Sequence, residues 1–240
     1  MNLISYTGQY YLYLILIITV YFVIFFLLVY LGNRKEMKKF KKELNPLSEE
    51  NKNLEWLTIR NIIFIHGLES SGEGYKAKFL KNLFSEILTP SLSPYSLKIP
   101  VDHLLNIRMD QLEELIHNMS NWIIIGSSFG GLMGTIYSLK HPKKVKLLIL
   151  LAPFLTSPKY YDSLPFPIDI PVFAIHGIHD SVVSARKARE HAKSLFSNLE
   201  YVLVDDDHQL HQTVGKLNWM NLINEYPIEK KIVPNEIIRQ

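Results

Sequence analysis

The apolar residues of this chain follow two different patterns, one near the N-terminus and one from about Trp56 onward. Residues 10–31 form a 22-residue apolar stretch in which Thr19 is the only polar residue that is not aromatic. From about Trp56, short apolar runs alternate with amphipathic segments. Such alternation is typical of a parallel sheet whose two faces are both covered by helices.

The second pattern predicts a single α/β domain over residues 56–240. Its apolar runs predict about six strands, at residues 61–66, 85–90, 121–126, 145–152, 171–176 and 200–205. These runs are nearly continuous in Ile, Val and Leu, as expected of strands that are buried on both faces. The amphipathic segments predict helices at residues 75–87, 108–119, 129–140, 184–196 and 209–224. We therefore expect a doubly wound, mostly parallel sheet.

The first pattern predicts a transmembrane helix, because about 20 apolar residues are enough to cross the hydrocarbon core of a membrane. A buried core helix of this length would normally show a polar face, and residues 10–31 show none. A cleaved signal peptide would have a basic start and a small-residue cleavage site, and neither is present. We expect residues 1–33 to be a retained anchor and residues 34–55 to be a juxtamembrane segment and linker.

The formal net charge of +3 is concentrated in one basic segment, which begins at Arg34 and extends through Lys42. A nucleic-acid-binding domain would instead spread basic residues over one face, so we expect no nucleic-acid partner. Basic residues beside a membrane span tend to stay in the cytoplasm, which predicts a single-pass membrane protein with a cytoplasmic C-terminal domain. The same basic segment is a candidate for contact with anionic lipid.

A G-x-S-x-G motif, made by Gly126, Ser128 and Gly130, lies between a predicted strand and a predicted helix. In a nucleophile elbow the serine occupies such a tight turn, and the glycines leave room for the neighbouring strand and helix. Ser127 stands at the x position and is expected to point away. The chain contains no cysteine, so the nucleophile must be an oxygen or a nitrogen. The alternative is that Ser128 only caps the helix that begins at Phe129.

A serine hydroxyl needs a base to take its proton and a carboxylate to orient that base. Asp180 and His208 each follow a predicted strand, where loops at the carboxyl edge of the sheet bring side chains together. We predict that Ser128 is the nucleophile, His208 the base and Asp180 the acid. Two other histidines are less suitable as the base. His211 is expected to lie inside the following helix. If His179 were the base, no later strand would be left to carry the acid.

Three consecutive acidic residues, Asp205, Asp206 and Asp207, precede His208 and offer a different interpretation. They could supply the acid or bind a metal, but a solvated turn that caps the next helix is the interpretation we favour. We therefore predict no metal site and no cofactor. His176, at the end of a predicted strand, is interpreted as a hydrogen-bonded structural histidine.

An acyl-transfer reaction also needs N–H donors for the oxyanion that forms on the attacked carbonyl. We predict that the backbone N–H groups of Phe129 and Leu68 are these donors, because Phe129 follows the nucleophile and Leu68 lies in the loop after an early strand. His66 and Gly67 are expected to shape that loop, with Gly67 allowing close backbone approach. Alternatively, the His-Gly pair only forms a turn.

With these motifs in this order, residues 61–219 resemble the α/β-hydrolase family, most closely its small esterase-like bacterial members. The resemblance rests on FIHGLESSG, IIIGSSFGGLMG, LLILLAPF, AIHGIHDSVV and VDDDHQLH. The first two strands of larger members have no counterpart, which implies a trimmed sheet of about six strands. Residues 153–170 are all that would form a cap, so the cap is expected to be minimal.

The resemblance implies a serine hydrolase that cleaves carboxylic esters or thioesters through an acyl-serine intermediate. The proline-rich, aromatic segment 153–170 would line an apolar entrance without closing it, which suits a small-molecule or lipid acyl ester at a membrane. Two alternatives stay open at this point. One is an acyltransferase that uses the same triad, and the other is a non-catalytic relative that binds a lipid or a protein partner at the membrane.

Overall fold

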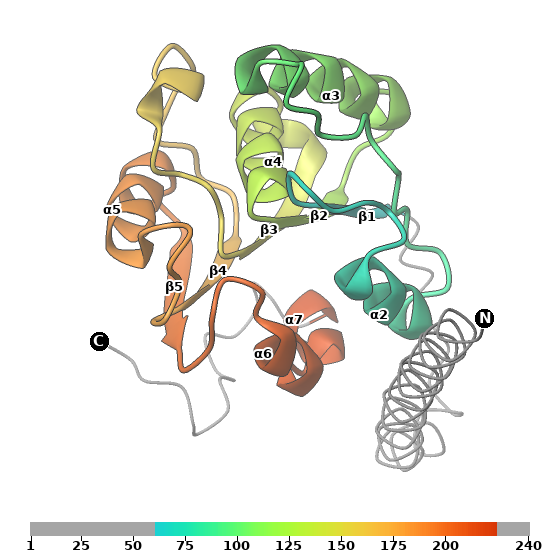
Figure 1. Ribbon diagram of the computed structural model, residues 1–240, viewed down its shortest axis with the longest axis vertical. Helices are drawn as coiled ribbons and strands as arrows, with labels where there is room; N and C mark the ends of the chain where they lie inside the picture. The colour runs from blue at the N-terminus through green and yellow to red at the C-terminus, as the bar shows by residue number, and fades with distance from the viewer. Residues whose placement is uncertain (1–60, 225–240) are drawn as a thin grey trace, which may run out of the picture. The chain divides into compact units, whose positions relative to one another are not determined.

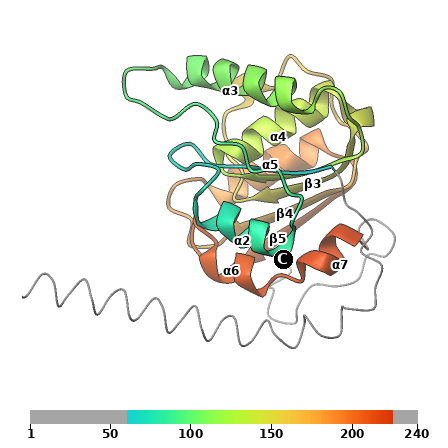
Figure 2. The ribbon, with the colours of Figure 1, turned by 90° about the vertical axis from the view of Figure 1, so that its right-hand side faces the viewer.

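The structure is a computed structural model that describes residues 61–224, and these residues form a parallel sheet of five strands with helices on both faces (Figures 1 and 2). The predicted α/β class and parallel sheet are confirmed. Across the sheet the strands follow their order in the chain: β1 (Ile62–Ile65), β2 (Trp122–Ser127), β3 (Val145–Leu151), β4 (Val172–Gly177) and β5 (Leu199–Val204).

Burial explains why these segments form the sheet. Every residue of β1, β2 and β4 is buried, and in β3 only Lys146 is exposed. The continuous apolar runs therefore belong to strands with both faces covered. The edge strand β5 is only partly buried at four of its six positions, and its sequence LEYVLV mixes polar and apolar residues accordingly.

The prediction of a sixth strand at residues 85–90 is wrong. Only Leu88 pairs with the sheet, through a single parallel bridge to Ile63 on the side of β1 away from β2. Ser85 and Glu86 are exposed, and Pro90 has no N–H with which to continue the ladder. The segment therefore touches the sheet at one point instead of extending it.

The helices divide between the two faces of the sheet (Figures 1 and 2). One face carries α3 (Val101–Ile116), α4 (Phe129–Lys140) and α5 (Ala185–Leu195), and the other carries α2 (Tyr75–Leu83), α6 (His211–Lys216) and α7 (Trp219–Asn224). Short 3-10 turns at Pro142–Lys144 and Pro158–Tyr160 complete the elements. Helix α4 lies against β1, β2 and β3, and all its residues except Lys140 are buried.

Three predicted helices differ from those observed. The helix predicted at residues 75–87 ends at Leu83, because Phe84 is extended. Helix α3 begins at Val101, seven residues before the predicted start, because Pro100 stands just outside the helix and Asp102 in its first turn complements the helix dipole. The predicted helix 209–224 is two helices. Leu217 is extended, which ends the first helix. The Val214 carbonyl, which would accept a backbone N–H in a continuing helix, instead accepts the indole N–H of Trp219 at 2.8 Å.

The path of the chain creates a crevice between the ends of β1 and β2. From β1 the chain runs through α2 to Leu88 on the outer edge of β1, and then through α3 on the opposite face to β2. The loops after β1 and β2 therefore leave the sheet toward opposite faces. In open α/β sheets, ligands bind at such a switch point, beyond the carboxyl ends of the strands.

Among residues 61–224, no helix is both long enough and apolar enough to cross a membrane. The predicted span at residues 10–31, the linker at 34–55 and the start of the domain near residue 56 lie outside the described residues.

Candidate active site

Ser128 lies in a sharp turn between β2 and α4, with φ +52° and ψ −113°, a conformation that residues with a side chain rarely adopt. Hydrogen bonds hold this turn. The Ser128 N–H donates to the Leu151 carbonyl at 2.9 Å, and the Ser128 carbonyl accepts from the N–H groups of Gly131 and Phe154. Its side chain makes no capping bond to α4. The hydroxyl is therefore left for another partner.

The two glycines of the motif are required by space. A Cβ on Gly126 would lie 2.5 Å from the Gly130 carbonyl oxygen, and a Cβ on Gly130 would lie 2.1 Å from the Ile65 carbonyl oxygen. Both distances are far below contact distance, and both involve backbone that cannot move aside. The small residues allow the turn to approach β1 and α4 closely, as the motif predicted.

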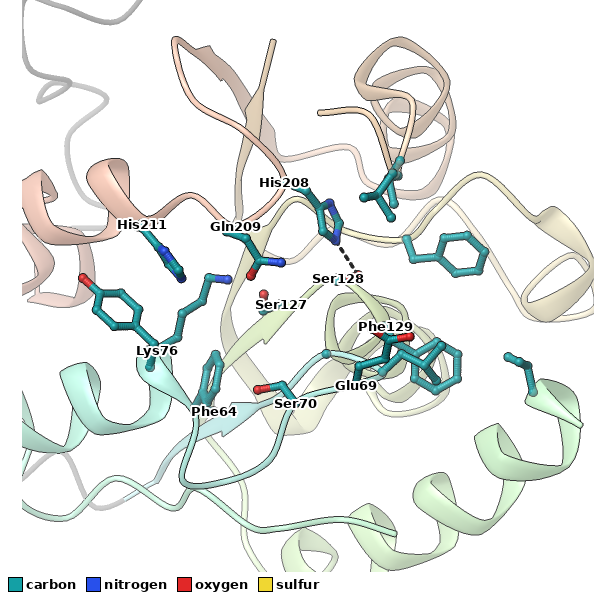
Figure 3. Close-up of a pocket in the computed structure, with 17 residues that line it drawn as sticks. Phe64, Glu69, Ser70, Lys76, Ser127, Ser128, Phe129, His208, Gln209 and His211 are labelled. Atoms are coloured by element: carbon teal, nitrogen blue, oxygen red, sulfur yellow. Dashed lines mark hydrogen bonds between the residues drawn. The ribbon is translucent and has the colours of Figure 1, made fainter. Parts of the chain in front are cut away.

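The structure brings Ser128, His208 and Asp180 together from the loops after β2, β5 and β4. The Ser128 hydroxyl oxygen is 3.0 Å from Nε2 of His208 (Figure 3), and Nδ1 of His208 is 2.7 Å from Oδ2 of Asp180. A carboxylate only accepts hydrogen bonds, so Nδ1 carries the hydrogen and Nε2 is left to accept the Ser128 proton. This is the geometry of a nucleophile, its base and the group that orients the base.

The side chain of Asp180 is fully buried and nevertheless ionised at neutral pH. Burial raises the pKa of this carboxyl, but hydrogen bonds from the Val183 N–H, from His208 and from the Val182 N–H outweigh burial, so the pKa lies below 3.8. The two backbone donors reach Oδ1 at 2.8 Å each, which leaves Oδ2 for the imidazole.

A second histidine contacts the same carboxylate oxygen. Nε2 of His176 is 2.8 Å from Oδ2 of Asp180 and 3.2 Å from the Val183 carbonyl, and Nδ1 is 2.7 Å from the Tyr201 hydroxyl. Both neighbours of Nε2 are acceptors, so Nε2 donates. Burial lowers the pKa of His176, which keeps the ring neutral and leaves Nδ1 to accept from Tyr201. Asp180 thus accepts N–H groups from two imidazoles.

The backbone N–H groups of Phe129 and Leu68 are the predicted oxyanion donors. Neither donates a hydrogen bond to another residue of the described segment, and both residues line the cavity that contains Ser128. The Gly67 carbonyl accepts from Nδ1 of His66 at 2.8 Å and from Arg108 at 3.4 Å. In a trans peptide the N–H points away from the C=O, so these bonds direct the Leu68 N–H away from Arg108.

The Arg108 side chain is fully buried beneath this loop. Its Nη2 donates to the Leu68 carbonyl at 2.9 Å, its Nε donates to the Ser93 carbonyl at 2.7 Å, and its guanidinium lies 5.6 Å from the centroid of the Phe129 ring. Burial lowers its pKa, and no carboxylate of residues 61–224 forms an ion pair with it. Arg108 therefore contacts both segments that carry the unpaired N–H groups.

The buried His66 ring forms hydrogen bonds that hold the same loop against the segment at Leu92. Its Nε2 accepts from the Leu92 N–H at 3.1 Å while its Nδ1 donates to the Gly67 carbonyl, and burial lowers its pKa so that the ring is neutral. At Gly67, a Cβ would make ordinary contacts of 3.5 Å with Ser127 and Ser128. Close backbone approach is therefore not what requires a glycine at this position.

Ser128 opens into a cavity of about 610 Å³ with two kinds of wall. Apolar side chains form one part: Leu68, Val101, Phe129, Phe154, Val182 and Val183. The other part contains the ring of Phe64 and several polar side chains, among them Ser70, Lys76, Gln209 and His211 (Figure 3). Of the predicted cap segment 153–170, only Phe154 lines the cavity, which agrees with a minimal cap.

The sequence of this domain matches a family model described as Alpha/beta hydrolase family over residues 62–216, more than half of the chain. The chain belongs to the alpha/beta hydrolase family. The resemblance seen in the motifs is thereby confirmed. Among curated proteins, none is significantly similar to it in sequence.

Solved structures of other alpha/beta hydrolases share the fold. The Alpha/beta hydrolase domain-containing protein 10 from mouse is 20% identical, with a TM-score of 0.54 over 70% of this chain and 90% of that one. A hydrolase of the alpha/beta superfamily from Xanthomonas campestris is 24% identical, with a TM-score of 0.51 over 64% and 90%. Est1E from Butyrivibrio proteoclasticus, solved with ferulic acid, is 15% identical, with a TM-score of 0.51 over 72% and 92%.

In this alpha/beta hydrolase, none of the alternative histidines and acids forms a hydrogen bond with Ser128, His208 or Asp180. His211 begins α6 and packs against the Tyr75 ring with centroids 4.3 Å apart, and His179 is exposed with Nε2 2.8 Å from Asp205. Asp206 accepts from the N–H and hydroxyl of Thr213 in α6, and Asp207 accepts from the Gln209 and Leu210 N–H groups. The acidic run thus forms a turn that is hydrogen-bonded to the first turn of α6, as predicted, but Asp206 is buried and not solvated.

Sequence reasoning missed Arg108 and the link between His176 and Asp180. Arg108 had a recognisable signal, because it occupies a position on the apolar face of α3, in the series Leu104, Leu105, Arg108, Met109 and Leu112. A cation at a core position needs buried acceptors. His176 stands four residues before Asp180, but the spacing alone does not show that the intervening turn folds back.

Proposed function

We propose that this protein is a serine hydrolase that cleaves carboxylic esters or thioesters through an acyl-serine intermediate. The observation that carries the proposal is the continuous hydrogen-bonded chain from Ser128 through His208 to Asp180, with distances of 3.0 and 2.7 Å, at the floor of an open cavity. Phe129 and Leu68, whose backbone N–H groups have no partner among the described residues, line the same cavity as this serine. Membership of the alpha/beta hydrolase family supports the same reaction class.

In the proposed reaction, Oγ of Ser128 attacks the carbonyl carbon while Nε2 of His208 takes the hydroxyl proton. The N–H groups of Phe129 and Leu68 stabilise the resulting oxyanion, and buried, ionised Asp180 stabilises the imidazolium. His208 then protonates the leaving alcohol or thiol, and the acyl-serine forms. A water molecule, deprotonated by His208, releases the acid and restores Ser128. These steps use side-chain and backbone groups, so the proposal requires no cofactor.

The proposal is tested by reacting the purified full-length protein with a fluorophosphonate and locating the adduct by peptide mass spectrometry. We expect a single stoichiometric adduct on Ser128, together with turnover of p-nitrophenyl or thiol esters. The same assay with an added alcohol separates hydrolysis from acyl transfer, because a transferase would produce the new ester in preference to the acid. A protein that is folded but neither labelled nor active would be a binding module instead.

Arg108 is expected to position the oxyanion site. In Arg108→Met, the Gly67 and Leu68 carbonyls lose a buried donor, and the loop is no longer held against Phe129. We expect kcat for a neutral ester to fall up to about 10²-fold with little change in KM, because oxyanion donors act on the transition state. Arg108→Lys should recover part of kcat.

The control for this prediction is Arg186→Met, which removes an exposed arginine that pairs with Glu190 on α5. This variant should keep the wild-type kcat. A rise in KM at unchanged kcat in Arg108→Met would assign the residue to substrate binding instead. Urea denaturation of each variant separates a loss of fold from a loss of rate.

We also propose that the chain is a single-pass membrane protein whose hydrolase domain faces the cytoplasm. The support is the uncharged stretch at residues 10–31 and the basic segment that follows it at Arg34. A reporter that is active only in the cytoplasm, fused to the C-terminus, is expected to be active. Activity of a reporter that works only on the opposite side of the membrane would show that the hydrolase domain does not face the cytoplasm.

A further inference from the structure

Lys76 places an ammonium group in the same cavity as Ser128. It lies in the first turn of α2, and its side chain extends beside Gln209 and His211 (Figure 3). The side chain is half-buried, and no residue in the described part of the chain forms a hydrogen bond or an ion pair with it. A positive charge is therefore held in the cavity without a direct counterion.

The nearest acidic groups are occupied elsewhere. Asp206 and Asp207 attract Lys76 across a distance, but their carboxylates accept hydrogen bonds from Thr213 and from the Gln209 and Leu210 N–H groups. Burial outweighs their attraction and lowers the pKa of Lys76 to about 8. The ammonium is thus mostly charged at neutral pH and poorly solvated, which favours binding of an anion.

The cavity is also asymmetric about the serine. In Figure 3, Lys76, Gln209 and His211 lie on one side of Ser128, and Phe129 lies on the other. Glu69, the one acidic residue among the described lining residues, lies on the Phe129 side. In Figure 3 the ring of Phe64 also lies on the Lys76 side, so one side of a bound ester would meet a cation, an amide and one aromatic ring, while the other would meet mainly apolar side chains.

We infer that the substrate is an ester or thioester with an anionic group on one side of the scissile bond, and that Lys76 binds this group beside Gln209. The inference rests on the proposed function and narrows it to anionic esters. Lys76 acts in binding and takes no part in the bond changes at Ser128. The apolar wall leaves room for the neutral part of the substrate.

The test compares matched charged and neutral esters on the full-length protein. For an anion on the acyl side, the pair is mono-p-nitrophenyl adipate and its methyl ester. For an anion on the alcohol side, the pair is 4-carboxyphenyl butyrate and the corresponding carboxamide. In at least one pair, we expect kcat/KM of the charged ester to exceed that of the neutral one by about tenfold, through KM.

In Lys76→Met, this ratio should fall to about one, and in Lys76→Arg it should be retained. Lys78→Met is the matched control, because Lys78 is exposed on the same helix and does not line the cavity. The ratio should be unchanged in that variant. An equal ratio in wild type and Lys76→Met overturns the inference. Failure of the proposed function is distinguishable, since the wild type would then turn over neither ester of a pair.

The pH profile gives an independent readout. A pH effect on the reaction at Ser128 is common to both esters of a pair and cancels in the ratio of their kcat/KM values, whereas loss of the Lys76 charge does not cancel. The wild-type ratio is expected to fall as pH rises through about 8, and in Lys76→Arg it should stay constant to higher pH. The other titratable groups near Lys76 are Tyr75, His211, Asp206 and Asp207. A flat wild-type ratio would contradict the inference.

Discussion

Replacing Ser128 by alanine is expected to lower kcat for ester hydrolysis by about 10⁶-fold, because among the described residues only the Ser128 hydroxyl is hydrogen-bonded to Nε2 of His208. The His208 imidazole lies 3.0 Å from this oxygen and has no role in the attack without it. The fold should be retained, since the turn is held by backbone hydrogen bonds and the serine side chain makes no capping bond. Turnover of p-nitrophenyl butyrate and fluorophosphonate labelling measure the loss.

Ser127→Ala is the matched control, because it removes the neighbouring hydroxyl from the last residue of β2. This variant should still be labelled on Ser128 and should keep kcat within a few-fold of wild type. Labelling that survives in Ser128→Ala, or disappears in Ser127→Ala, would assign the nucleophile to a different residue.

Asp180→Asn is expected to lower kcat by about 10⁴-fold. Oδ1 of Asp180 accepts two backbone N–H groups, and Oδ2 accepts the N–H groups of His208 and His176. An amide nitrogen fits neither position, because every neighbour is a donor. If the amide NH₂ group faces His208, Nδ1 of His208 must accept a hydrogen bond. The imidazole hydrogen then moves to Nε2, and Ser128 loses its base. If the NH₂ group faces the Val182 and Val183 N–H groups, these two buried donors lose their acceptor.

Asp205→Asn provides the comparison, because Asp205 is also hydrogen-bonded to a histidine, His179, but both side chains are exposed. Its kcat should stay near the wild-type value. The kcat of Asp180→Asn, measured across pH 6–9, shows whether His208 no longer acts as the base or acts only less effectively. An Asp180→Asn enzyme with kcat within tenfold of wild type would show that the carboxylate does not orient the imidazole.

Much of the fold was accessible from the sequence because it depends on local pattern. The strands β1 to β5 coincide with predicted apolar runs, and α4 begins and ends at the predicted residues 129 and 140. A strand buried on both faces leaves a continuous apolar run regardless of its neighbours. The segment near Leu88 was misjudged, because two apolar residues predicted a strand although Pro90 cannot continue the hydrogen-bond ladder along the edge of β1.

The candidate site divides in the same way. The turn that holds Ser128 is specified locally by Gly126 and Gly130, so the motif located it. The distances to His208 and Asp180 depend on how the loops after β5 and β4 return to the edge of the sheet. Chain order predicted which residues meet, whereas the structure shows that His208 is the histidine bonded to both Ser128 and Asp180.

The sequence by itself determined the class of the fold, the positions of strands β1 to β5 and the position of Ser128, since each follows from residues close together in the chain. Only the tertiary structure decided that Arg108 underlies the loop at Leu68, that His176 shares Asp180 with His208, and that Lys76 enters the cavity. Each of these contacts joins different elements. Such contacts depend on how helices and loops pack across the sheet, and no local pattern of residues encodes that packing.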